Sequence, residues 1–212
     1  MVDVAAAAAA IARGEVVAYP TETFYGLAVD ALNEAALAKL RVLKGRAAEK
    51  AFSLLISGRA MLATLCSEIS PRTERLMAQH WPGPLTLALP ARSGLPASIV
   101  ADGFVAVRVS SNPLAQALVA AAGRPITATS ANPAGSTPPR TAMEVAAYFA
   151  PESCLILDGG TSPGGQPSTL ARVRGESVEI LRQGAVVVAD GDVGVVTASS
   201  TQGRGGGRSR LS

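Results

Sequence analysis

The sequence predicts a mixed α/β fold in which a twisted sheet is flanked by helices. Short apolar runs typical of strands alternate with segments of helical periodicity along most of the 212 residues. Several of these runs lie too close together in sequence for a helical crossover, which favours antiparallel pairs beside parallel ones. Apolar residues make up 48% of the chain, which is enough for one substantial core.

The N-terminal segments predict a helix, a strand and a second helix. Asp3 can cap a helix that continues through the alanine run and ends at Gly14. The apolar run 15–20 then predicts a strand. A helix is expected over 32–43, where one helical face would carry Leu32, Ala36, Leu40 and Leu43.

The middle of the chain adds two strands with a helix between them. Residues 51–56 are nearly all apolar and predict a buried strand. Ser70 followed by Pro71 is typical of a helix start. The turn signal at 81–84 then separates this helix from a strand over 85–89.

Helices and strands continue to alternate in the second half. A helix is expected over 112–123, which begins with Asn-Pro and ends in glycine, and another over 141–149. Thr141 and Glu144 have the spacing of a capping box at the second helix. Strands are expected over 104–109, 125–130, 154–160, 168–173, 178–184 and 185–189.

The chain divides into one folded domain, residues 1–190, and a tail, residues 191–212. Glycine, serine and arginine dominate the tail without apolar periodicity, so disorder is expected there. Of the formal net charge of +3, the tail carries three arginines and one aspartate, or +2, and the domain +1. Net charge is therefore no argument for nucleic-acid binding by the domain.

Cysteine and histidine usage excludes several kinds of site. Cys66 and Cys154 are far apart in sequence, and His80 is the single histidine, so neither a zinc cage nor a disulfide framework is expected. No apolar run is long enough to span a bilayer, and the alanine tract lacks the features of a signal peptide. The cytoplasm is the expected location, with no membrane partner.

Five cations occur where isolated charges are unusual. Lys44, Arg46 and Lys50 directly precede a buried strand, Arg108 lies inside an apolar strand, and Arg182 ends another. A buried cation is costly unless it is paired or binds an anion. The chain has neither a Walker pattern nor GxGxxG, so side chains are expected to recognise a phosphate or carboxylate. The alternative for residues 44–50 is a solvated helix end with Glu49 as a local counter-charge.

Loops rich in glycine and small polar residues follow the predicted strands at 20–26, 129–135 and 158–169. Such loops commonly form the ligand site of an α/β sheet. Within TSAN, Ser130 and Asn132 would face the same side of an extended segment. The alternative is an ordinary Asn-Pro turn whose polar side chains bond local backbone.

Together these segments resemble one family. YPTETFYGLAVDA, KGR with Lys50, WPGPLT, VAVRV, TSAN, PST and LRQGAV occur in the order found in threonylcarbamoyl-AMP synthases, the YrdC-like family. The resemblance covers about residues 5–188 and implies the YrdC-like fold, with a concave ligand-binding face on its twisted mixed sheet. It also implies synthesis of L-threonylcarbamoyladenylate and pyrophosphate from L-threonine, bicarbonate or CO2, and ATP with Mg²⁺. The product would pass to a transferase complex that modifies an adenosine of tRNA.

The resemblance also implies roles for individual residues, while the metal ligands stay open. The implied catalytic residues are Lys44, Arg46 and Lys50. ATP contacts are implied for Arg46, Lys50, Phe104, Ser130, Asn132, Pro138 and Arg182. Threonine contacts are implied for Thr23, Arg108, Ala128 and Ser168.

The chain departs from the common family pattern in places. Ala47 stands where proline is usual, Leu55 where some members are polar, and Ser110 and Asn112 replace the proline and histidine of RVP-x-HP. These changes bear on loop rigidity and the threonine pocket rather than on the reaction class. The first alternative function is a module that binds double-stranded RNA or tRNA weakly, and the second is another carbamoyl-transfer chemistry on this fold.

Overall fold

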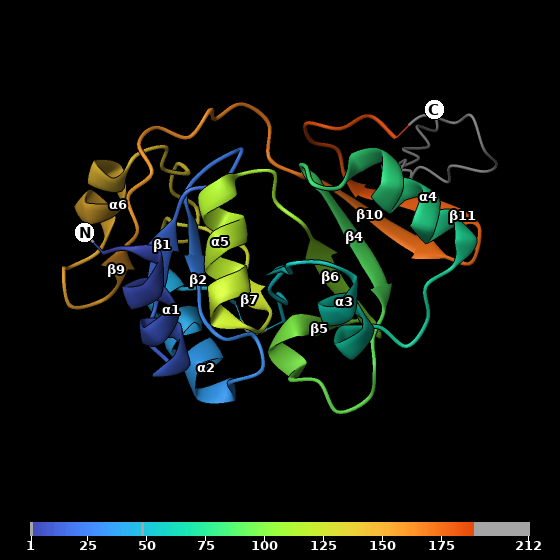
Figure 1. The fold of residues 1–212 in the computed structure, drawn as a ribbon, viewed down its shortest axis with the longest axis horizontal. Helices are drawn as coiled ribbons and strands as arrows, with labels where there is room; N and C mark the ends of the chain where they lie inside the picture. Colours follow the sequence, from blue (N-terminus) through green and yellow to red (C-terminus); the bar gives the residue numbers. More distant parts are fainter. Residues whose placement is uncertain (1, 48, 189–212) are drawn as a thin grey trace, which may run out of the picture.

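The computed structural model describes residues 2–47 and 49–188, whose strands form two mixed sheets (Figure 1). The smaller sheet has the order β8 (Thr129–Ser130), β2 (Gly26–Ala28), β1 (Val17–Tyr19), β9 (Leu155–Ile156). The larger has the order β11 (Ser177–Arg182), β10 (Thr169–Arg174), β4 (Leu85–Pro90), β6 (Phe104–Arg108), β3 (Leu54–Leu55), β7 (Ile126–Thr127), with β5 (Val100–Ala101) also paired to β6. The predicted tail, 191–212, lies outside the described residues, so the domain boundary stays a prediction.

The mixed α/β class is confirmed, but the strands form two sheets where the sequence predicted one. The segment 125–130, expected as one strand, divides at Ala128 into β7 and β8. β7 pairs with β3 in the larger sheet, and β8 pairs with β2 in the smaller one. The Ala128 N–H donates to the Ser53 carbonyl oxygen at 2.7 Å, which secures the crossing point. One short segment thereby joins the two sheets.

Three helices begin at capping residues that the sequence predicted. The side chain of Asp3 accepts from the Ala6 N–H, that of Ser70 from the Thr73 N–H, and Thr141 forms a capping box with Glu144. The helices are α1 (Val4–Ala12), α2 (Glu34–Lys44), α3 (Arg59–Leu65), α4 (Pro71–His80), α5 (Pro113–Ala122) and α6 (Ala142–Tyr148), with a 3₁₀ turn at Ala97–Ile99.

Two sequence-based details are wrong. Leu32 lies before α2 and is 45% exposed, because the helix starts only after the Asn33 cap; Leu37 takes its place on the buried face. The described part of 185–189 forms no strand. Instead, the Thr169 hydroxyl accepts from the Val186 N–H and donates to the Val186 carbonyl oxygen. Both backbone groups of Val186 are therefore hydrogen-bonded although it belongs to no strand.

The core has two parts. Tyr25, Leu27 and Leu40 are fully buried in the first, which links α2 to both sheets. The second joins Ile11 of α1 and Leu118 of α5, two helices that lie side by side over the smaller sheet (Figure 1). Within the described ranges, no helix is long and apolar enough to cross a membrane.

Candidate functional site

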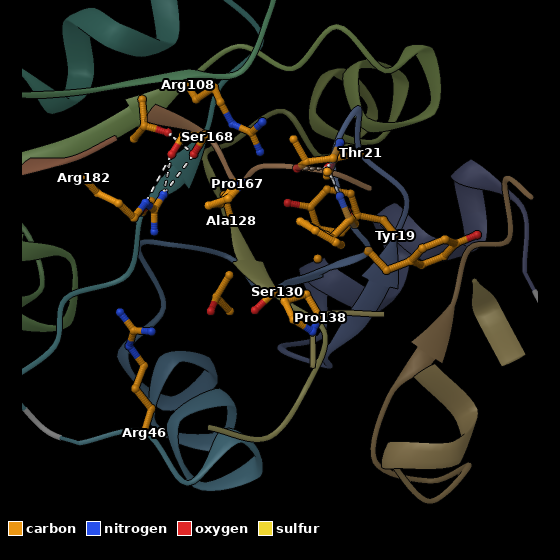
Figure 2. Close-up of a pocket in the computed structure, with 18 residues that line it drawn as sticks. Tyr19, Thr21, Arg46, Arg108, Ala128, Ser130, Pro138, Pro167, Ser168 and Arg182 are labelled. Carbon is orange, nitrogen blue, oxygen red and sulfur yellow. Dashed lines mark hydrogen bonds between the residues drawn. The ribbon is translucent and has the colours of Figure 1, made fainter. Parts of the chain in front are cut away.

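A cavity of about 490 Å³ lies where strand ends and loops of the two sheets converge. Arg108 ends β6, Arg182 ends β11, and Ser130 ends β8, while Ser168 directly precedes β10. Figure 2 shows Arg108, Ser168 and Arg182 on one side of the cavity, with Arg46 and Ser130 across from them. Of the residues implied by resemblance, the structure places eight in the wall: Thr23, Arg46, Arg108, Ala128, Ser130, Pro138, Ser168 and Arg182.

The Arg46 side chain is held in place by backbone carbonyl groups of the segment that follows it. Gly45 ends α2 with a φ of 58°, a left-handed conformation that glycine adopts without strain. The Arg46 Nε then donates to the Lys50 carbonyl oxygen at 3.1 Å and its Nη2 to that of Ala51 at 2.8 Å. The guanidinium also lies 5.0 Å from the centre of the Phe52 ring. These contacts pre-organise a cation at the cavity wall.

A bulge in β11 sets the direction of Arg182. The register between β10 and β11 shifts so that Leu181 has no partner between Ile180 and Arg182. Bulges of this kind redirect a side chain near a site. The Arg182 Nη2 donates to the Ser168 carbonyl oxygen at 2.8 Å and lies 3.1 Å from its Oγ. The Ser168 hydroxyl is also 2.9 Å from the Thr86 hydroxyl. Thr86 therefore fixes the position of Ser168, and Ser168 in turn fixes that of Arg182.

The cavity has an excess of positive charge. Burial lowers the pKa of Arg46, helped by the charges of Arg41 and Arg182, and burial together with the Arg108 charge lowers the pKa of Arg182. In the described part of the chain, neither Arg46 nor Arg182 has a carboxylate partner within salt-bridge distance. Cations that raise one another's energy in this way favour an anionic ligand.

Arg108 differs from the other two arginines because it has an acidic partner. Its Nη1 donates to one carboxylate oxygen of Glu22, and the Ser110 hydroxyl donates to the other. The side chains of Arg108 and Glu22 are 7% and 12% exposed, so this ion pair is largely removed from water. The sequence drew attention to Arg108 but missed Glu22, because nothing local distinguishes a glutamate between two threonines.

Two residues implied by the resemblance, Lys44 and Asn132, do not line the cavity but make contacts within the TSAN loop that borders it. The Lys44 Nζ donates to the carbonyl oxygens of Ser130 and Asn132 at 2.5 and 2.6 Å, and burial lowers the pKa of Lys44 to about 8. The Asn132 amide donates to the carbonyl oxygens of Pro133 and Ser136 at 2.9 and 2.7 Å, as in the turn alternative. Lys44 therefore ties the end of α2 to the TSAN loop.

Two further implied residues also lie outside the wall. Lys50 is exposed, and its backbone carbonyl is what contacts Arg46. The ring of Phe104 lies under the guanidinium groups of Arg172 and Arg174, with centroid distances of 5.2 and 4.9 Å. Their proposed roles as ATP contacts stay predictions.

Other wall residues were not anticipated from the sequence. Thr86 is a buried hydroxyl within the otherwise apolar β4, which is the signal that could have indicated it. Thr21 accepts from the Phe24 N–H and donates to the Phe24 carbonyl oxygen, which shapes the loop that carries Thr23. Gly165 and Pro167 complete the rim.

No group of three or more His, Cys, Asp or Glu side chains within residues 2–47 and 49–188 could hold a metal ion. Mg²⁺ keeps several waters and commonly takes oxygen ligands from substrate phosphates.

Comparisons with known proteins are consistent with this geometry. A family model named for the Sua5, YciO and YrdC proteins, and described as "Telomere recombination", matches residues 9–184. A threonylcarbamoyl-AMP synthase of Pyrococcus abyssi is 37% identical over 85% of this chain and 53% of its own length. One from Vibrio cholerae is also 37% identical, over 82% of this chain and 94% of its own length. The chain thus spans about half of the archaeal relative and nearly all of the bacterial one.

A solved structure supports the same fold. The crystal structure of P. abyssi Sua5 complexed with L-threonine superposes with a TM-score of 0.81. Its sequence is 37% identical, and the match covers 85% of this chain and 54% of that one.

Proposed function

Because the chain belongs to the family of the Sua5, YciO and YrdC proteins, we propose that it is an L-threonylcarbamoyladenylate synthase. It would convert L-threonine, bicarbonate or CO2, and ATP into threonylcarbamoyl-AMP and pyrophosphate. The proposal is supported by relatives from an archaeon and a bacterium that carry the name of this enzyme. The related structure that contains L-threonine adds support for the amino-acid substrate.

The observation that carries the proposal is the pair of guanidinium groups that have no acidic partner among the described residues, Arg46 and Arg182, on opposite sides of one cavity (Figure 2). A triphosphate supplies the charge that this arrangement lacks. In this assignment the wall residues that contact ATP are Arg46, Ser130, Pro138 and Arg182. The remaining proposed ATP contacts are Lys50, Phe104 and Asn132.

The amino acid is assigned to the part of the cavity beside β6. Arg108 would bind the threonine carboxylate through donors that Glu22 does not use. The hydroxyl groups of Thr23 and Ser168 are the polar neighbours available to the rest of the substrate, and Ala128 lies at the junction of the sheets. Lys44, implied as catalytic, acts in this assignment by holding the TSAN loop.

The proposed chemistry requires positioning more than strong acid or base groups. The threonine ammonium first loses a proton to water. The amine then attacks CO2 to form an N–C bond while one C=O π bond opens onto oxygen, and the nitrogen passes a second proton to water to give the carbamate. A carbamate oxygen then attacks the α-phosphorus of ATP, and the bond to the leaving pyrophosphate breaks. Arg46 and Arg182 would hold the phosphate oxygens during this transfer and stabilise the negative charge on the leaving group.

Mg²⁺ is proposed as a companion of the triphosphate, where it would neutralise phosphate charge. Its ligands would be phosphate and water oxygens, and the Ser130 hydroxyl is an oxygen in the wall of the same cavity as Arg46 and Arg182. The product would pass to a transferase complex that places the threonylcarbamoyl group on an adenosine of tRNA.

The proposal is tested by pyrophosphate release from ATP and magnesium, with L-threonine and bicarbonate omitted in turn. Release that requires both co-substrates is expected, and Arg46→Ala and Lys50→Ala should each reduce it at least about tenfold. Arg75→Ala removes an exposed arginine that does not line the cavity and serves as the matched control. A folded protein that releases no pyrophosphate in response to threonine would refute the proposal. If that protein binds RNA with a steep salt dependence, the RNA-binding alternative takes its place.

A further inference from the structure

The ion pair between Glu22 and Arg108 adjoins the cavity, because Arg108 is one of the residues that line it. Glu22 lies in the loop after β1, and its neighbours Thr21 and Thr23 both line the cavity, as Arg108 does. Arg108 and Ser110 donate one hydrogen bond to each Glu22 carboxylate oxygen. Ser110 is only 2% exposed, so the carboxylate is anchored on its inner side.

The carboxylate retains capacity for a ligand. Two carboxylate oxygens can accept about four hydrogen bonds, and two are used by protein donors. The side chain of Glu22 is 12% exposed, so Arg108 and Ser110 do not enclose it completely. A donor entering there would meet acceptor atoms already held in position.

Charge in the cavity restricts what this donor can be. Among the described residues, the cavity wall includes three arginines and no acidic side chain, so an ammonium group is repelled near each of these arginines. Asp158, the other nearby carboxylate, already accepts from the Tyr25 hydroxyl at 3.1 Å and from the Gly160 N–H at 2.9 Å. An ammonium ion would therefore find its favourable position next to Glu22.

We propose that Glu22 determines specificity for a zwitterionic α-amino acid, accepting from its ammonium group while Arg108 binds its carboxylate. The α-carboxylate and α-ammonium of an amino acid are separated by one carbon, as the adjacent charges of Arg108 and Glu22 require. The ion pair is electrically neutral, and so is the zwitterion, so the complex buries no net charge. A carboxylic acid without the amine would instead place a second negative charge beside Glu22. This inference rests on the proposed function for the identity of the substrate.

The test compares two ligands that differ in one group. L-Threonine and 2,3-dihydroxybutanoate, in which a hydroxyl replaces the ammonium, are titrated into the protein by calorimetry. We expect wild type to bind threonine at least about tenfold more tightly, and Glu22→Gln to reduce this preference at least about tenfold. Ser110→Ala is the matched control, because it removes one anchor of the carboxylate but leaves the charge. It should weaken threonine binding and retain the preference.

A structural role for Glu22 predicts a different result. If Glu22→Gln weakens both ligands equally, or changes neither, the inference is overturned. ATP affinity within about twofold of wild type would show that the variant is folded. Should the variant fail to fold, a preference below tenfold in wild type overturns the inference by itself.

The proposed function and the inference about Glu22 can fail independently of each other. An intact threonine preference that depends on Glu22, without threonine-dependent pyrophosphate release, would leave the amino-acid site standing and refute the synthase. Pyrophosphate release that requires threonine, combined with a threonine preference that does not depend on Glu22, would support the synthase and refute the role of Glu22. A wild-type protein that binds no threonine would refute both.

Discussion

Replacement of Lys44 by methionine tests whether this buried lysine supports the site at a cost in stability. Burial lowers the pKa of Lys44 from 10.5 to about 8. Below pH 8 the ammonium is protonated in both the folded and the unfolded chain, and the folded state bears the full cost of burying the charge. As pH rises, the folded protein releases this proton first while the unfolded chain still binds it. The free energy of unfolding contributed by Lys44 therefore increases with pH.

The magnitude follows from the difference of about two and a half pKa units. Between pH 7 and pH 10, proton linkage gives wild type a gain of about 2–3 kcal/mol relative to Lys44→Met, which cannot titrate at this position. At pH 7 the loss of two hydrogen bonds to the carbonyl oxygens of Ser130 and Asn132 destabilises the variant, and removal of the buried charge partly offsets that loss.

Urea unfolding of both proteins at several pH values from 7 to 10 measures this difference. All other titrations are shared by the two proteins and cancel. Lys39→Met removes an exposed lysine from the same helix and controls for general loss of charge. A difference between wild type and Lys44→Met that stays constant across this pH range would refute the interpretation of Lys44 as a desolvated cation.

Three other predictions concern the site and the core. Arg182→Ala should raise the KM for ATP at least about tenfold, measured as pyrophosphate release, and an unchanged KM would contradict its assignment. Gly184→Ala should destabilise the fold by about 3 kcal/mol in urea unfolding, because the new Cβ would lie 2.1 Å from the Pro167 carbonyl oxygen. Burial raises the pKa of Cys66 to about 12 and of Cys154 to about 11. Alkylation of both at pH 8 should be at least about 100-fold slower than that of free cysteine, as mass spectrometry can measure.

Much of the secondary structure could be predicted because its signals are local. Asp3, Ser70 and Thr141 each satisfy N–H groups within three residues of themselves, so the start of each helix is written in a few adjacent positions. The order of short motifs along the chain was likewise readable, and it predicted the family that the comparisons confirmed. Neither inference depends on which distant segments meet.

The arrangement of the site depended on distant segments and could not be read locally. The division of 125–130 at Ala128 is decided by two different partner strands, β3 and β2, one on each side. Lys44 was expected among the cations of the site, yet its ammonium turns to carbonyl groups more than eighty residues away. Sequence periodicity indicates which face of a helix or strand is buried, but not which atoms that face contacts.

The sequence by itself determined most of the helices and strands, the family and the three arginines of the cavity, because capping, periodicity and short motifs are properties of nearby residues. The tertiary structure decided which of these cations have no acidic partner within residues 2–47 and 49–188 and which one is neutralised. Arg46 and Arg182 keep their charge available, whereas Arg108 is paired with Glu22. That distinction is electrostatic and depends on distances between segments far apart in the chain, so it exists only once the two sheets have come together.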